Sequence, residues 1–210
     1  MPKLLILGAG THARVVLDCL RTMGRGADVL GFVEVDGDRA RWGRSYDGCR
    51  VLGGVNKLAS LAKAADQAAL GYGENVKRAE LLDLARKHGL RLPALVHPDA
   101  SVSPRAKLGP GSQVLAGAVV VTGARLGAGV IVNTAATVDH DCRIADAVHI
   151  APGAHLAGNV TVGRLAWVGI GSSIREGSRI GAGALIGAGA AVVNDVRPGA
   201  RVVGVPARPI

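Results

Sequence analysis

The chain has 210 residues, enough for one large or two small domains, and its hydrophobic content of 49% is ample for a core. No run of about 18 apolar residues predicts a transmembrane helix, and the glycine-rich first residues are unlike a signal peptide. Three cysteines do not make a disulfide framework, so we expect a cytoplasmic protein with no membrane span.

The net charge of +9 admits either a nucleic-acid partner or a polyanionic small ligand such as a nucleotide or coenzyme A. The basic residues are scattered singly along the sequence, and aromatic residues, which stack on bases, make up only 2% of it. We therefore expect a small polyanionic ligand and no nucleic acid.

Residues 1–95 alternate between strand and helix patterns. An apolar run over residues 3–7 predicts a buried strand, and a helix follows from His12 to Met23 with Val15, Val16, Leu17 and Leu20 facing inward. Strands over residues 29–33 and 68–71 and helices over 55–64 and 75–88 complete this part. The alternation predicts a small parallel sheet with helices on its faces, a half-Rossmann-like α/β domain.

The turn Gly8-Ala9-Gly10-Thr11-His12-Ala13 is close to the dinucleotide-binding fingerprint, and Glu34 follows Gly10 by 24 residues. Such glycines let phosphate oxygens approach backbone N–H groups at a helix N-terminus, where His12 would also lie. A tight turn that merely needs small residues remains an alternative. The domain is half the size of a full dinucleotide fold, so a mononucleotide portion fits better than NAD.

Residues 96–210 carry a six-residue repeat, which predicts a parallel β-helix. Every sixth residue is a branched aliphatic that would fill the interior, and a small or β-branched residue follows four places later. Three hexads make one triangular coil, so residues 18 apart should stack on each other. The aliphatic series is Val102, Leu108, Val114, Val120, Leu126, Val132, Val138, Ile144, Ile150, Leu156, Val162, Val168, Ile174, Ile180, Ile186 and Val192.

Polar residues interrupt this plain solenoid at Asn133-Thr134 and at Asp139-His140-Asp141. His140 would lie at an outer position directly below Gly158, where the bare backbone admits a thioester or phosphate. A neutral imidazole is the usual proton acceptor near neutral pH, and the Asp141 carboxylate would orient it. A solvated polar corner is the alternative interpretation.

His149 and His155 are six residues apart and therefore fall on different sides of the prism. A zinc site needs converging ligands, so we expect no metal site within one chain. His149 and the polar residues 133–141 lie on different stretches of the coil. One prism alone is not expected to gather them, and a neighbouring chain would complete the set.

The chain resembles bacterial left-handed β-helix acyltransferases of the sialic acid O-acetyltransferase and nucleotide-sugar N-acetyltransferase type, over essentially all of its residues. It is most similar to enzymes that acetylate UDP- or GDP-linked 4-amino-4,6-dideoxy sugars. The residues that carry the resemblance are Gly8 to Ala13, Gly73-Glu74-Asn75 with Arg78, Asn133-Thr134, Val138 to Cys142, His149, Gly158-Asn159 and Val203 to Ala207.

The resemblance implies a left-handed coil and a homotrimer with sites between prisms. It implies that His140 is the catalytic base and Asp141 its acidic partner, and that acetyl-CoA lies near Gly158, Ile170 and His149. The Gly158 N–H would polarise the thioester carbonyl. The nucleotide sugar would contact residues of the amino-terminal domain and Asn133; the candidates are Gly8, Gly10, Thr11, His12, Glu34, Asp36, Asn75, Arg78 and Asn133.

The expected function is therefore acetyl-CoA-dependent N-acetylation of a nucleotide-linked amino sugar in bacterial glycan biosynthesis. Two alternatives stay open: O-acetylation of sialic acid or another sugar, and a non-catalytic binding scaffold. Two departures from the family pattern are Thr11 in place of a third glycine and Ala145-Asp146 after the catalytic hexad.

Overall fold

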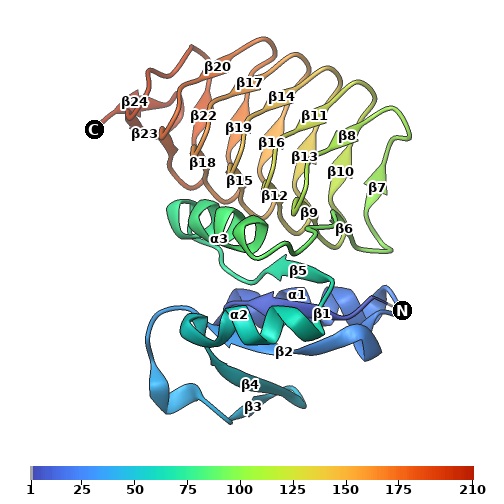
Figure 1. The fold of residues 1–210 in the computed structure, drawn as a ribbon. Coiled ribbons are helices and arrows are strands. Elements are labelled where there is room, and N and C mark those ends of the chain that lie inside the picture. Colours follow the sequence, from blue (N-terminus) through green and yellow to red (C-terminus); the bar gives the residue numbers. More distant parts are fainter. Residues whose placement is uncertain (1) are drawn as a thin grey trace. The chain divides into compact units, whose positions relative to one another are not determined.

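The structure is a computed structural model that describes residues 2–210 as two compact units, one ending at Pro93 and the other running from Ala94 to Ile210 (Figure 1). The predicted boundary, after residue 95, lies two residues further along the chain. Within residues 2–210, no helix is long and apolar enough to cross a membrane.

The first unit contains a five-stranded sheet in the order β3-β4-β2-β1-β5. Its strands are β1 (Leu4–Leu7), β2 (Val29–Glu34), β3 (Ser45–Tyr46), β4 (Cys49–Gly54) and β5 (Gln67–Leu70). All pairs except β3–β4 are parallel, and every residue of β1 and β5 is buried. The predicted parallel sheet is confirmed, because strands covered on both faces must be apolar throughout.

The hairpin of β3 and β4 was not predicted. Asp47 and Gly48 form its turn with φ of 51° and 73°, values that a two-residue hairpin turn of this type requires. The Asp-Gly pair between residues 46 and 49 is the sequence signal that indicates this hairpin.

The helices of this unit are α1 (Thr11–Thr22), α2 (Leu58–Leu61) and α3 (Asn75–Lys87), with short 3-10 helices at Gly26–Asp28, Arg39–Arg41, Val55–Lys57 and Ala62–Ala64. The helix predicted over 55–64 is thus one turn of α-helix between two 3-10 turns. In α1 the buried residues are Ala13, Val16, Leu17, Cys19 and Leu20. Val15 was wrongly predicted to face inward; it is 43% exposed because it lies about 200° around the helix from Ala13.

The second unit is a parallel β-helix whose coils stack from β7 to β22 (Figure 1). Residue pairs 18 apart are in register, as in Val120–Val138 and Val138–Leu156, so three hexads per coil are confirmed. The interior is one cluster of buried Val, Ile, Leu and Ala side chains, and Cys142 is buried among them. These aliphatic residues were predicted from the six-residue series.

We call the three sheets of the prism its first, second and third faces. The first face holds β7 (Ser101–Val102), β10 (Val119–Val120), β13 (Thr137–Val138), β16 (His155–Leu156), β19 (Ser173–Ile174) and β22 (Ala191–Val192). The second holds β8 (Lys107–Leu108), β11 (Arg125–Leu126), β14 (Arg143–Ile144), β17 (Thr161–Val162) and β20 (Arg179–Ile180). The third holds β6 (Leu95–Val96), β9 (Gln113–Val114), β12 (Ile131–Val132), β15 (His149–Ile150), β18 (Trp167–Val168), β21 (Leu185–Ile186), β23 (Arg201–Val203) and β24 (Arg208–Pro209).

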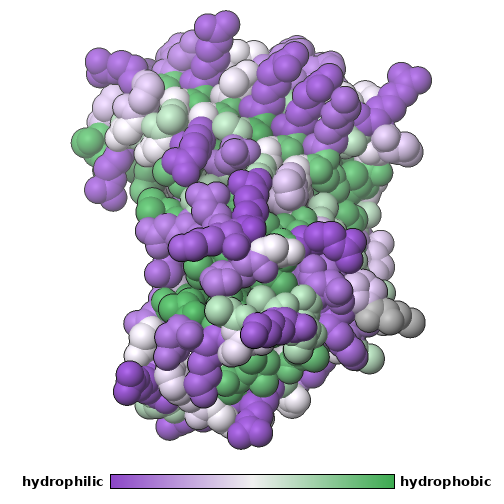
Figure 2. All heavy atoms as spheres, in the orientation of Figure 1, coloured by the Kyte–Doolittle hydropathy of each residue, from purple (hydrophilic) through white to green (hydrophobic). Residues whose placement is uncertain are grey.

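Basic residues that are scattered in the sequence are aligned on the second face. Its outward column consists of Lys107, Arg125, Arg143, Thr161 and Arg179, all exposed and in register. Figure 2 shows hydrophilic side chains projecting where Figure 1 places these strands. Among residues 2–210 none of the four basic side chains forms an ion pair, and the outward column of the first face has no Lys or Arg. Residues that are scattered in the sequence thus form one vertical ladder in space, because an 18-residue spacing is one full coil.

Candidate active site

His140 and Asp141 lie at the turn between β13 on the first face and β14 on the second. The His140 Nδ1 atom is 3.1 Å from Asp141 Oδ2, and the two side chains are 43% and 61% exposed. The His140 backbone N–H donates to Asp139 Oδ1 at 2.6 Å, and this hydrogen bond stabilises the turn on the N-terminal side of His140. The dipeptide therefore forms an oriented imidazole–carboxylate pair at an accessible corner.

The imidazole of His140 lies directly against Gly158 on the next coil. A Cβ atom at position 158 would overlap Nε2 and Cε1 of the ring and lie 3.0 Å from Cδ2. The predicted stacking of His140 and Gly158 is confirmed, and only glycine leaves room for the ring. The Gly158 N–H donates no hydrogen bond to any of the described residues, so it remains available to an incoming carbonyl.

The surroundings of His140 are acidic. The pKa of His140 is raised from its ordinary value, first by the hydrogen bond to Asp141 and then by the charges of Asp139, Asp141 and Glu176, while desolvation opposes the shift. Because a carboxylate accepts at Nδ1, the neutral ring carries its proton there and Nε2 holds the lone pair. Nε2, next to Gly158, is thus the nitrogen that can accept a proton.

His149 does lie beside one residue of the polar stretch within a single chain. Asn133 Nδ2 is 3.0 Å from His149 Nε2, and the ring of His149, 5% exposed, packs on Trp167 at 4.3 Å between centroids. We expected that one prism would not bring these residues together, and for Asn133 this is wrong. β12 and β15 are neighbours on the third face, so residues shortly after β12 reach His149.

His140 and Ile170 lie at two different corners of the prism. Ile170, 57% exposed, lies between β18 and β19, at the edge of the first face opposite to Gly158. Trp167, which sequence reasoning missed, was recognisable as the residue 18 places after His149.

Among residues 2–210, no three His, Cys, Asp or Glu side chains are placed to hold a metal ion.

In the first unit the glycine turn joins β1 to α1. Gly8 has φ of 125°, and a Cβ there would overlap the Gly71 carbonyl oxygen, so this position requires glycine. Gly10 caps α1 without a side-chain hydrogen bond, and no acidic residue occupies the first turn, which begins at Thr11. No acidic residue of the first turn therefore offsets the positive end of this 12-residue helix.

A pocket of about 380 Å³ opens at this turn. Its walls include Gly10, Thr11 and three arginines, Arg14, Arg41 and Arg44. The arginines were not predicted, because two of them lie in the loop after β2 and only folding brings that loop to α1. The Arg41 Nη1 atom donates to the Ala9 carbonyl oxygen at 3.1 Å, which holds the loop over the turn.

Glu34 is the last residue of β2, Asp36 lies just after the strand, and the two are joined by a hydrogen bond. Glu34 is 1% exposed and accepts the Asp36 backbone N–H at 2.8 Å, while Asp36 Oδ1 accepts the Tyr72 hydroxyl at 2.9 Å. This last hydrogen bond is the main cause of the raised pKa of Tyr72. Asp36 is exposed and can meet a ligand, whereas the Glu34 carboxylate lies inside the unit.

Arg78 is fully buried, at 0% exposure, and its guanidinium organises the loop before α3. It donates to the Gly73 carbonyl at 2.6 Å and to Asn75 Oδ1 at 2.8 Å, and burial lowers its pKa to about 10. Gly73 in turn lies beside His12. In this conformation Arg78 supports the loop and is not accessible for the direct substrate contact that was predicted; Asn75 is 5% exposed.

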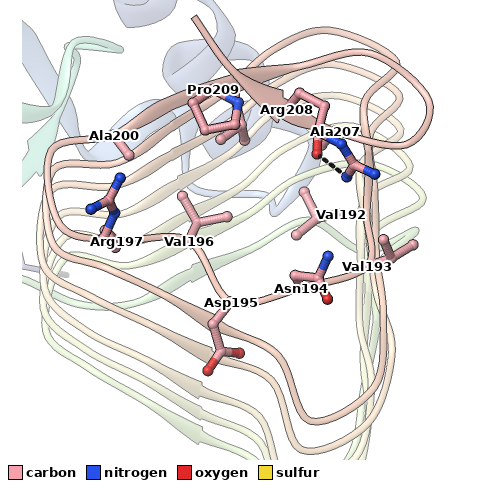
Figure 3. A pocket seen from close by; sticks show the side chains of 11 residues that line it. Val192, Val193, Asn194, Asp195, Val196, Arg197, Ala200, Ala207, Arg208 and Pro209 are labelled. Atoms are coloured by element: carbon pink, nitrogen blue, oxygen red, sulfur yellow. Dashed lines mark hydrogen bonds between the residues drawn. The ribbon is translucent and has the colours of Figure 1, made fainter.

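A further pocket, of about 330 Å³, lies at the last coil of the β-helix (Figure 3). Val192, Val196, Val202 and Ala207 give it an apolar floor, and Figure 3 shows Asp195 directed away from this floor. None of the predicted catalytic or binding residues lines it, so we attribute it to the open end of the prism.

Known proteins match both units. The PglD N-terminal domain model matches residues 3–84. The acetyltransferase domain of PglB from Neisseria gonorrhoeae, solved in complex with acetyl coenzyme A, is 42% identical, with 100% of this chain and 99% of that chain covered and a TM-score of 0.91. A variant of the GDP-perosamine N-acetyl transferase from Caulobacter crescentus, in complex with CoA and GDP-perosamine, is 36% identical, with 100% and 97% covered and a TM-score of 0.94.

WeeI from Acinetobacter baumannii AYE is 27% identical, with 99% of each chain covered and a TM-score of 0.85. Among curated proteins, none matches the chain. These matches cover both the α/β unit and the left-handed β-helix, and the predicted fold class and the predicted enzyme class, an acetyl-CoA-dependent acyltransferase, are confirmed. The chain belongs to the family of hexapeptide-repeat acetyltransferases with a PglD-type N-terminal domain.

Proposed function

We propose that the chain transfers an acetyl group from acetyl-CoA to the 4-amino group of a nucleotide-linked 4-amino-4,6-dideoxy sugar. The observation that carries this proposal is the His140–Asp141 pair lying against Gly158. Relatives solved with acetyl coenzyme A, or with CoA and GDP-perosamine, support the two substrates. The reaction would be a cytoplasmic step of bacterial glycan biosynthesis.

In the proposed mechanism the sugar amine attacks the thioester carbonyl, and His140 Nε2 accepts the proton that the nitrogen loses. Asp141, hydrogen-bonded at Nδ1, keeps the lone pair on Nε2 and stabilises the imidazolium that forms. The Gly158 N–H donates to the developing oxyanion. Collapse of the tetrahedral intermediate breaks the C–S bond, and the proton on Nε2 passes to the CoA thiolate.

We propose that the nucleotide diphosphate binds in the pocket at the start of α1. Backbone N–H groups at a helix N-terminus favour anions, and Arg44 adds positive charge at the same pocket. Arg14 and Arg41 also line it, but they are ion-paired with Asp47 at 2.6 Å and with Asp38 at 3.0 Å, so a diphosphate would have to share them with these carboxylates. Asp36, exposed at the end of β2, is the carboxylate placed to accept hydrogen bonds from ribose or base. Calorimetry with UDP and GDP tests this site, and binding of neither at millimolar concentration would refute it.

The catalytic role of His140 is tested by its replacement with Ala. Loss of a positioned general base costs on the order of 10²–10⁴ in rate, so His140→Ala should lose this much in kcat with little change in Tm. His88→Ala is the control, because His88 is a histidine of the first unit, at the C-terminal end of α3, and belongs to none of the proposed sites. Activity of His140→Ala within threefold of wild type, by thiol release from acetyl-CoA, would exclude the role.

Amine and hydroxyl acceptors are separated by a panel of nucleotide sugars. Turnover with a nucleotide-linked 4-amino sugar and none with its 4-hydroxy counterpart is the expected result. Preferred transfer to a hydroxyl would make the enzyme an O-acetyltransferase, and no turnover with either would favour a binding scaffold.

We also propose a homotrimer in which the site is shared between chains. The outward column of the first face consists mostly of small residues, among them Ser101, Thr137, Ser173 and Ala191, which suit close packing of prisms. Light scattering should give about three times the 21.3 kDa chain mass. Mixed trimers of His140→Ala and Gly10→Trp should regain activity if the two sites act from different chains, and a stable active monomer would refute the trimer.

A further inference from the structure

The carboxylate of Asp141 occupies a space that exists because residue 123 is glycine. Gly123 lies one coil below, 18 residues earlier, at the equivalent turn, and both residues have left-handed φ values, 74° and 59°. A Cβ at position 123 would overlap Asp141 Oδ1 and lie 3.2 Å from its Cγ. The Asp141 side chain is therefore folded down over the bare backbone of the preceding coil.

This folded position is the one that turns Asp141 Oδ2 to His140 Nδ1 at 3.1 Å. Among residues 2–210, this is the only hydrogen bond that the Asp141 side chain makes. At 61% exposure, no surrounding protein wall holds the carboxylate in place. The absence of a side chain at Gly123 therefore allows the Asp141 carboxylate to stay where it accepts the hydrogen bond from His140.

We propose that Gly123 is a positioning residue, whose missing side chain lets the Asp141 carboxylate turn to His140. Each member of the pair then packs against a glycine: His140 lies against Gly158 of the next coil, and Asp141 lies against Gly123 of the preceding coil. This inference rests on the proposed role of His140 for its catalytic consequence, but the contact itself can be measured without catalysis.

A side chain at position 123 must push the carboxylate away from its place. Three carboxylates raise the pKa of His140, those of Asp139, Asp141 and Glu176, and the hydrogen bond that His140 donates to Asp141 has the largest effect. When that bond is lost, the pKa of His140 falls toward its ordinary value, and its Nδ1 proton is no longer fixed. A smaller fraction of the His140 side chains is then in the tautomer that has its lone pair at Nε2.

The test is Gly123→Ala in the full chain, with Gly183→Ala as the matched control. Gly183 has a similar φ of 66° at another turn, and a Cβ there meets nothing within 4 Å. Both variants carry the same left-handed strain on alanine, but only Gly123→Ala touches Asp141. Imidazole titration followed by ¹⁵N NMR gives the His140 midpoint, with His155 as an internal reference.

We expect a lower His140 midpoint in Gly123→Ala, between those of wild type and Asp141→Asn because the displaced carboxylate keeps its charge, and an unchanged midpoint in Gly183→Ala. The rate kcat should fall by about tenfold or more, no further than in Asp141→Asn, since an unoriented imidazole is the shared defect. The double variant Gly123→Ala/Asp141→Asn should be no slower than Asp141→Asn alone.

A wild-type midpoint and rate in Gly123→Ala would overturn the proposal, and so would multiplying losses in the double variant or an equal loss in Gly183→Ala. Gly123→Asn is a second variant if alanine prevents folding, because Asn tolerates a left-handed φ while still carrying a Cβ. If His140→Ala keeps wild-type activity, the proposed catalysis fails, yet the titration still decides whether Gly123 sets the Asp141–His140 contact.

Discussion

Replacement of Arg78 by Met separates support of the loop from contact with substrate. The side chain makes two short hydrogen bonds to Gly73 and Asn75 and a longer one, 3.5 Å, to the Tyr72 carbonyl. Bonds from a charged donor contribute about 1.5–3 kcal/mol each, so the two short ones amount to about 3–6 kcal/mol.

Part of this loss of stability is offset because the Arg78→Met substitution removes a buried charge. The lowering of the Arg78 pKa from 12.5 to about 10 corresponds to roughly 3.5 kcal/mol at about 1.4 kcal/mol per unit. A net loss of about 1 kcal/mol follows, which lowers Tm by about 2–4 °C in a chain of this size. Met keeps most of the buried volume, so no large cavity adds to the loss.

The assay is a thermal melt by circular dichroism together with calorimetric titration of UDP and GDP. Lys77→Met is the control on the same helix, because Lys77 makes only an exposed ion pair with Glu80 at 3.5 Å and should stay within about 0.5 kcal/mol of wild type. An Arg78→Met variant with unchanged Tm but tenfold weaker nucleotide binding would refute the loop-support reasoning and restore direct contact.

Four other predictions concern charges and thiols. Asp141→Asn removes the main cause that raises the His140 pKa, so the acid limb of kcat/KM against pH should move to lower pH while the maximum falls; a limb that stays in place would contradict the assigned partner. Because that pKa is raised in the folded state, the pair stabilises the fold below the unfolded pKa of about 6.5 and not above the folded value, so the Tm difference between wild type and His140→Gln should vanish at alkaline pH. Burial raises the pKa of Cys19 and Cys142 to about 11, so neither thiol should react with a disulfide reagent at pH 8 until the chain unfolds. Arg143→Glu places a carboxylate between Arg125 and Thr161 on the second face and should raise Tm at low salt, an increase that 0.5 M NaCl should abolish if like-charge repulsion is the cause.

The sequence by itself determined the β-helix and its register. A six-residue period has one interpretation, and it fixes which residues stack 18 apart, so Gly158 could be placed against His140 before any coordinates. The parallel sheet of the first unit was likewise predicted, because strands such as β1 that are buried on both faces are apolar along their length. The hairpin of β3 and β4 was not predicted because β3 has only two residues and the charged Arg50 interrupts the apolar run of β4.

Only the tertiary structure decided which polar residues meet, because such contacts depend on side-chain direction and on loops far apart in sequence. The sequence gives Asn133 and His149 no common pattern, but neighbouring strands bring them to 3.0 Å. Arg41 reaches the glycine turn through a loop whose path no periodicity specifies. Arg78 was predicted as a ligand contact, and the fold instead buries it among carbonyl groups, since a residue's chemistry is visible in sequence but its exposure is not.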